Sequence, residues 1–204
     1  MKKFLVFIAT IIISIILAGL FGIIHDEITY TISNEYFTKF KFHQFGLANT
    51  DDKGILPNPR QAVAIVGVLA TTWVGAIIGL ALGITGMAFM DHKKMFKAML
   101  AALLLTFKIT VLTAFIGFFY GKFYLASTKV HWWLPDDLVD RNNFITVGCI
   151  HSASYLGGLT GLVFSLGFLI KKNRIQRKEI RNVSQRGDAN QIESLQDDVK
   201  QASE

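Results

Sequence analysis

FLVFIATIIISIILAGLFGII, residues 4–24, is an uncharged run of apolar side chains that follows Lys2 and Lys3. As a helix rising about 1.5 Å per residue, the run is long enough to cross a hydrocarbon core of roughly 30 Å. A secretory signal peptide has a similar basic start, but its apolar region usually covers only about 7 to 15 residues. No convincing small-x-small cleavage site follows, so we expect a first membrane span that is retained.

Three further apolar runs occupy residues 62–90, 98–120 and 144–170. Asn58 is placed to cap the helix of the first of these runs, and Pro59 suits a first helical position. Only a few residues separate the runs 62–90 and 98–120, so we expect them to form an antiparallel hairpin.

The composition agrees with a membrane protein. Hydrophobic residues make up 51% of the chain and charged residues 18%, below the roughly 25% of a typical soluble domain. The single cysteine, Cys149, excludes an intramolecular disulfide and a cysteine-based zinc motif. The sequence therefore predicts an all-α integral membrane protein with a bundle of four transmembrane helices, two outer loops (25–61 and 121–143) and a basic-then-acidic tail (171–204) that is partly disordered.

The basic residues predict the orientation. Thirteen of the 21 Lys and Arg residues fall on the side of the N-terminus, counted over the start of the chain, the 91–97 connection and the tail. Seven fall in the two opposite loops, together with eight acidic residues. The positive-inside rule therefore places both termini in the cytoplasm, which we expect to be that of a bacterium with the protein in its inner membrane. This distribution explains the net charge of +6 without a nucleic-acid partner.

Glycines recur at four-residue intervals in the second span, at Gly75, Gly79 and Gly83. Small residues at this spacing let helix backbones approach closely inside a membrane. The ridge predicts packing within the bundle, and the alternative is an interface with a second copy or with another membrane protein.

The first outer loop begins with HDEITYTISNEYFTKFKFHQFG, residues 25–46. Residues 28–32 alternate apolar and polar side chains, which predicts a short strand. Ser33 can cap a short helix that carries several aromatic residues, or residues 40–42 can continue the alternation as a hairpin. We favour a strand followed by a helix, forming an extracytoplasmic lid whose aromatic and Lys side chains lie at the lipid headgroups. In the second outer loop, Pro135 and the two acids after it predict a helix start.

Imidazole and carboxylate groups gather on the outer side, where they could bind a transition metal. No pair of histidines has the i, i+3 or i, i+4 spacing of a helical metal motif, so the ligands would have to converge from separate segments. The candidate metal ligands are His25, Asp26, Glu27, His43 and His131, with His151 in the outer half of the fourth span.

Lys108 is unusual because it lies 11 residues from Lys97, about 16 Å along the third span and close to the middle of the membrane. A charge at that depth costs a few kcal/mol and often marks a functional site. Tyr155 falls at a similar depth in the fourth span, and His151 lies one turn nearer the outside. We expect Lys108, His151 and Tyr155 to line a polar crevice that binds a ligand or relays protons, or else to form a hydrogen-bonded cluster that fixes the helix register.

These observations favour a non-enzymatic membrane protein that binds a lipid-like or anionic ligand, or docks a partner, through an outward-facing crevice under the aromatic lid. The alternative is a membrane-embedded, metal-dependent enzyme with a His and carboxylate site on the extracytoplasmic face. A transporter or channel is less favoured because four spans without a repeat provide no conduction path within one chain. Apart from membrane lipids, the sequence identifies no partner.

Overall fold

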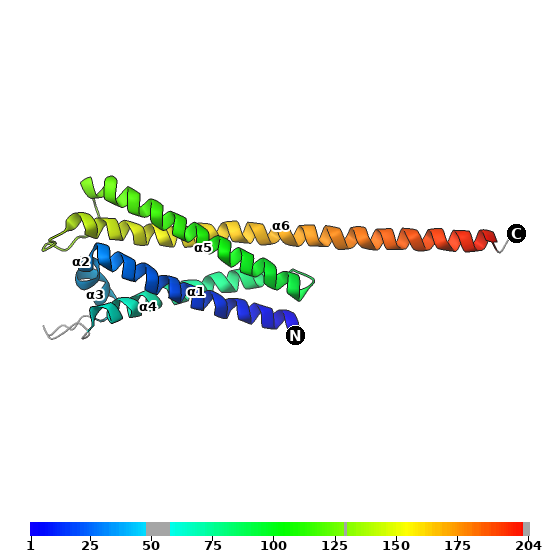
Figure 1. Ribbon diagram of the computed structural model, residues 1–204, viewed down its shortest axis with the longest axis horizontal. Helices are drawn as coiled ribbons and strands as arrows, with labels where there is room; N and C mark the ends of the chain where they lie inside the picture. Colours follow the sequence, from blue (N-terminus) through cyan, green and yellow to red (C-terminus); the bar gives the residue numbers. More distant parts are fainter. Residues whose placement is uncertain (48–57, 129, 202–204) are drawn as a thin grey trace.

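The computed structural model describes residues 1–47, 58–128 and 130–201, with side chains as far as Gly187. It is all-helical over these residues and contains four helices that are long and apolar enough to cross a membrane. These are α1 (Lys2–Ile32), α4 (Pro59–Gly86), α5 (His92–Phe123) and α6 (Arg141–Gln201). Each of the four predicted spans therefore corresponds to one long helix (Figure 1).

Side-chain caps set where three of these helices begin. Asn58 accepts a hydrogen bond from the Arg60 backbone N–H at 3.0 Å, so the predicted start of α4 is confirmed. Asp91 caps α5 in the same way, and Asp140 accepts from the backbone N–H of Asn143 at the start of α6. The helix start predicted at Pro135 is wrong, because a turn occupies that segment and the cap comes five residues later.

The four helices form two closely packed pairs, α1 with α4 and α5 with α6, and contacts between the pairs are much sparser. The predicted hairpin of the second and third spans does not form as a packed pair. Residues 87–91 join α4 to α5, but α4 packs along α1 because its glycines lie against that helix.

Glycine contacts hold α1 and α4 together. A Cβ built on Gly22 would lie 2.1 Å from the Gly67 carbonyl oxygen, so only glycine fits there. The predicted ridge of Gly75, Gly79 and Gly83 also faces α1, where Ser14 is among the nearest neighbours. A second copy could reach this ridge only if α1 moved away.

Residues 33–47, which we call the lid, fold over one end of the bundle as three short helices: α2 (Asn34–Tyr36), η1 (Phe37–Lys41, with π-helical geometry) and α3 (Phe42–Gln44). The Ser33 hydroxyl accepts a hydrogen bond from the backbone N–H of Tyr36, so the predicted cap is confirmed. The alternative hairpin at residues 40–42 is absent from the described lid.

The strand predicted at residues 28–32 is wrong, because these residues form the last turns of α1. The Thr29 hydroxyl donates to the backbone carbonyl of His25, four residues back, as Thr does inside helices. Intrinsic preferences differ by less than about 1 kcal/mol per residue, so continuous packing of α1 on its neighbours outweighs the β-type pattern.

The lid has a buried aromatic core. Phe37 and Phe42 are fully buried and pack with residues at the starts of α4 and α6, including Val63 and Phe144. The lid therefore closes this end of the bundle, the lid end.

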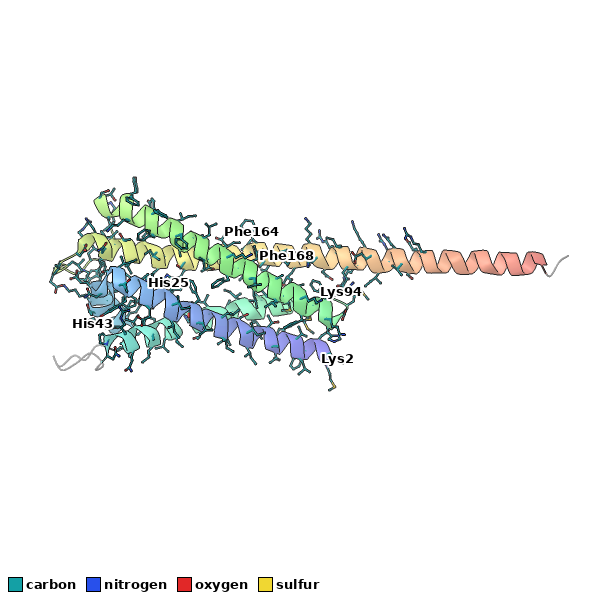
Figure 2. All side chains as sticks on the ribbon, viewed as in Figure 1. Lys2, His25, His43, Lys94, Phe164 and Phe168 are labelled. Atoms are coloured by element: carbon teal, nitrogen blue, oxygen red, sulfur yellow. The ribbon has the colours of Figure 1, made fainter. Side chains whose placement is uncertain are left out.

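Basic residues mark the opposite end. Lys2 and Lys94 lie there together, whereas His25 and His43 lie at the lid end (Figure 2). Beyond this opposite end, α6 continues without a break through the predicted tail to Gln201 (Figure 1).

Candidate functional site

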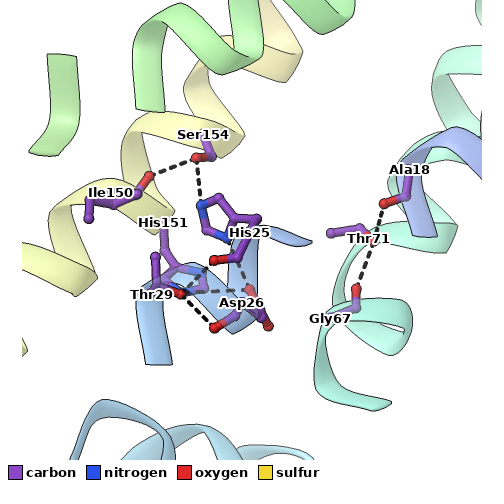
Figure 3. A network of polar contacts seen from close by, with 9 residues as sticks. All are labelled: Ala18, His25, Asp26, Thr29, Gly67, Thr71, Ile150, His151 and Ser154. Atoms are coloured by element: carbon purple, nitrogen blue, oxygen red, sulfur yellow. Dashed lines mark hydrogen bonds and ion pairs between the residues drawn. The ribbon is translucent and has the colours of Figure 1, made fainter. Parts of the chain in front are cut away.

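Three chemically reactive side chains meet where α1 approaches α6 beneath the lid. His25 and Asp26 come from α1 and His151 from α6, and one donor atom from each lies within 4.8 Å of the other two (Figure 3). We call these three residues the His–Asp–His cluster. Asp26 and His151 are buried, and His25 is nearly so.

The contacts within the cluster are short. Nδ1 of His25 lies 3.0 Å from Oδ1 of Asp26, and Nε2 of His151 lies 3.8 Å from the same oxygen. The other His25 nitrogen, Nε2, lies 3.0 Å from the Ser154 hydroxyl. Thr29 completes the group, with its hydroxyl oxygen 3.4 Å from Nε2 of His151 (Figure 3).

Ser154 influences the tautomer of His25. Its hydroxyl lies 2.8 Å from the backbone carbonyl of Ile150 in its own helix, to which it donates. With its single proton used there, Ser154 can only accept a hydrogen bond from Nε2–H of His25. In a neutral imidazole this leaves Nδ1 unprotonated and directed at the Asp26 carboxylate, so two acceptors face each other unless a proton or a cation lies between them.

The aromatic rings of the lid hold the second imidazole in place. The Tyr36 ring stacks on His151 with centroids 5.0 Å apart and an interplanar angle of 22°, and Phe37 contacts the same imidazole. Burial raises the pKa of the Tyr36 hydroxyl, with smaller contributions from Tyr155 and the Asp26 charge. The lid therefore excludes water from this side of the cluster.

One carboxylate oxygen in the cluster has no partner. Asp26 is 2% exposed, and its Oδ2 is buried without a hydrogen bond to any described group. An unpaired carboxylate oxygen in an apolar interior is unfavourable by several kcal/mol unless the group is neutralised or bound.

A cavity of about 100 Å³ extends from the cluster between the two helix pairs. Most of its wall is apolar, with side chains such as Leu17, Val74 and Ile78. Four Ser and Thr hydroxyl groups line the cavity away from the cluster, and each donates a hydrogen bond to a backbone carbonyl. The pairs are Ser14 to Thr10, Thr71 to Gly67 or Ala18, Thr106 to Ala102, and Thr110 to Thr106. The polar groups left for a ligand are thus concentrated at the cluster end, near Tyr155.

The structure brings two of the three predicted crevice residues to this cavity and leaves the third outside. His151 and Tyr155 line it. Lys108 is exposed on the outer side of α5 and is absent from the lining, because the cavity wall is formed by its neighbours Thr106, Phe107 and Thr110. Helical rotation of about 100° per residue separates these faces, and the prediction from depth alone did not include it.

Of the predicted metal ligands, His25 and Asp26 join His151, whereas the others lie elsewhere. Glu27 forms an ion pair with Arg60 at 2.6 Å. His43 and His131 are exposed at the lid end, outside the group of donor atoms.

Sequence reasoning missed Ser154 and Thr29 as members of the site. The spacing contained a signal for both: His25 and Thr29 are four residues apart, and His151 and Ser154 three apart, so each pair lies on one helical face. Because residues 28–32 were predicted as a strand, Thr29 was not expected to share a helical face with His25.

Charged residues fasten the lid over the site. Glu35 accepts hydrogen bonds from the backbone N–H groups of Val139 and Asp140 at 3.0 and 2.7 Å, and Lys39 bridges Glu35 and Asp137. These hydrogen bonds lower the pKa of Glu35 to about 2. Glu35, Lys39 and the 137–140 segment form what we call the lid latch.

Comparison with models of protein families, with curated proteins and with solved structures finds no match to this chain.

Proposed function

We propose that this chain is a multi-pass protein of a bacterial inner membrane that binds a lipid-like amphiphile in its interhelical cavity. One observation carries the proposal: an apolar cavity whose unsatisfied polarity lies at a single end, at the His–Asp–His cluster. Ligand sites in proteins typically combine an apolar wall with a few convergent polar groups in this way.

The size of the cavity limits what it can enclose. An apolar cavity of about 150 Å³ holds one benzene molecule, so about 100 Å³ accommodates a few carbon atoms next to a polar head group. The rest of a longer chain would leave past Phe107 and Tyr155, the half-exposed members of the lining, and continue into the surrounding lipid.

The described lining contains no Lys or Arg, so it offers no fixed positive charge for an anionic head group. Lys108 was the residue on which the prediction of an anionic ligand rested, and it lies outside the cavity. The polar end offers imidazole, carboxylate and phenol groups.

A second candidate function is metal-dependent chemistry on the bound amphiphile. Two imidazoles and a carboxylate, the donor set of the His–Asp–His cluster, match the three-ligand zinc sites that leave a coordination position open for substrate.

Filling the cavity tests amphiphile binding. A Cβ on Gly158, which lines the cavity, would have Thr110 Oγ1 as its nearest neighbour at 3.9 Å, so a larger side chain can begin there without a clash. We expect Gly158→Leu to lower photocrosslinking of a diazirine-bearing fatty acid in liposomes about tenfold, because the leucine occupies the ligand volume.

Gly167→Leu is the matched control, since it places the same side chain on the same helix at a position with no atom within 4 Å of the added Cβ. Crosslinking should be unchanged in this variant. Equal crosslinking of Gly158→Leu and the parent protein, with both folded, would refute the proposed site.

A further inference from the structure

The distances in the His–Asp–His cluster are close to those of a metal site. Zinc bonds of about 2.0 to 2.2 Å in tetrahedral geometry separate two ligand atoms by roughly 3.3 to 3.5 Å. The two distances to Asp26 Oδ1, 3.0 Å from His25 Nδ1 and 3.8 Å from His151 Nε2, lie on either side of that value. All three donor atoms lie within 4.8 Å of one another, so small adjustments of the side chains would bring them to one ion.

The negative charge of the buried Asp26 carboxylate also favours a bound cation. In the described part of the chain, the basic side-chain nitrogens within 4.0 Å of the Asp26 carboxylate belong to His25 and His151 and to no Lys or Arg. Oδ2 of Asp26 is buried and unpartnered. Buried Lys41 of the lid interacts electrostatically with Asp26, but the pair is not within ion-pair distance. A bound divalent ion would neutralise the carboxylate by direct coordination.

The surrounding residues support this role. Histidines that bind metals usually donate their second ring N–H to an oxygen, which fixes the tautomer and the ring orientation. Ser154 is placed to accept that bond from His25 Nε2 and so leaves Nδ1 free toward Asp26. Stacking on Tyr36 orients the His151 ring.

We propose that His25, Asp26 and His151 form a binding site for a divalent transition metal. Two nitrogens and one carboxylate oxygen suit Zn²⁺, and three protein ligands leave one tetrahedral position for water or for a group from the adjoining cavity. Metal binding at this site does not depend on the proposed amphiphile.

The test is a titration of the detergent-purified full chain, stripped of metal with a chelator, using Co²⁺ as the spectroscopic probe and Zn²⁺ as the competitor. We expect visible absorption typical of four-coordinate Co²⁺, saturating at a single ion per chain and abolished by Zn²⁺. Asp26→Asn keeps the shape of the side chain but removes its charge, and should weaken binding at least 100-fold. Ser154→Ala should weaken it about 10- to 100-fold, the usual effect of losing such a supporting bond.

Glu27→Gln is the matched control, because Glu27 neighbours Asp26 in sequence but pairs with Arg60 outside the cluster. Its affinity for Co²⁺ should equal that of the parent. Helicity and thermal unfolding, measured on every variant, identify any that fail to fold, and His25→Gln provides a second ligand substitution if Asp26→Asn is one of them.

Absence of saturable Co²⁺ binding by the folded parent protein would overturn the proposal. Binding that survives both Asp26→Asn and His25→Gln, or that Glu27→Gln weakens equally, would overturn it too. Gly158→Leu should keep its Co²⁺ affinity, so failure of amphiphile binding and failure of the metal site give different results.

Discussion

Glu35 shows how a single side chain can hold the lid in place. Its two carboxylate oxygens accept from consecutive backbone N–H groups, and Lys39, four residues on, adds an ion pair at 2.9 Å. The two N–H groups lie just before α6 and precede its first intrahelical bonds, so the carboxylate takes the place of water there. Because hydrogen bonds to an ionised acceptor are stronger than neutral ones, the latch depends on the charge of Glu35.

This dependence predicts a loss of lid stability in acid. The folded-state pKa of Glu35 is about 2, below its ordinary value near 4.5, so the stabilisation is complete above about pH 4.5 and is lost as the pH falls toward 2. We expect the protection of the amides in residues 34–44, measured as the hydrogen-exchange rate relative to the intrinsic rate at each pH, to fall over that range. In Glu35→Gln, the lid should exchange faster at neutral pH and lose most of this pH dependence. Asp136→Asn is the control, because Asp136 is exposed in the segment before α6, next to the latch residue Asp137; this variant should behave like the parent. An unchanged pH profile in Glu35→Gln would contradict the latch.

At the scale of elements, the two helix pairs are held by close approach of backbones. Lipid removes most of the hydrophobic drive for helices to associate, so packing and interhelical hydrogen bonds replace it. Gly22 and Gly67 bring α1 and α4 into backbone contact, and the Thr71 hydroxyl lies 2.7 Å from the Ala18 carbonyl of the facing helix. The α1 and α4 pair positions His25 and Asp26, so its geometry determines that of the site.

Adding one methyl group at this contact should separate the pair. In Gly22→Ala the new Cβ would lie 2.1 Å from the Gly67 oxygen, and backbone atoms cannot yield as a flexible side chain does. We expect a loss of about 1 to 3 kcal/mol or more in the free energy of unfolding, the usual range for overpacking. Unfolding of the parent and of Gly22→Ala in mixed micelles with increasing SDS measures this difference in the free energy of unfolding.

Gly167→Ala is the control for that measurement. Gly167 is exposed in α6 with open space around it, so alanine should stabilise the helix by up to about 1 kcal/mol through its higher propensity. Equal stability of Gly22→Ala and the parent would show that the glycine contact is not required.

At the scale of the whole molecule, the two ends of the bundle differ in chemistry. The lid end has the aromatic lid, its latch and the His–Asp–His cluster, and the other end has the basic residues of the N-terminus, the α4 to α5 connection and the start of the tail (Figure 2). Such asymmetry predicts that the lid end faces away from the cytoplasm.

Cysteine labelling tests the orientation. We expect a membrane-impermeant maleimide to label Ser127→Cys in intact cells and to label Ser184→Cys only after lysis, both in a Cys149→Ala background. Ser127 and Ser184 are exposed, at the lid end and in the tail helix respectively. The reverse pattern would show that the chain is inserted the other way round.

The number of long helices and their approximate positions follow from the sequence alone. A span is a local property, since some 20 consecutive apolar residues need no information from the rest of the chain. The caps at Asn58 and Ser33 were predictable for the same reason, because a cap joins residues only two or three positions apart.

Only the tertiary structure decided which helices pair and which residues form the site. The sequence placed Lys108 and Tyr155 at similar depths, but depth does not give the rotation of a helix about its axis, and packing turns Lys108 away from the cavity. It also offered His25, Asp26 and His151 as candidates without showing that they meet, since 125 positions separate Asp26 from His151. Their meeting depends on how α1 lies beside α6, and a local sequence pattern does not contain the packing of two helices that are distant in the chain.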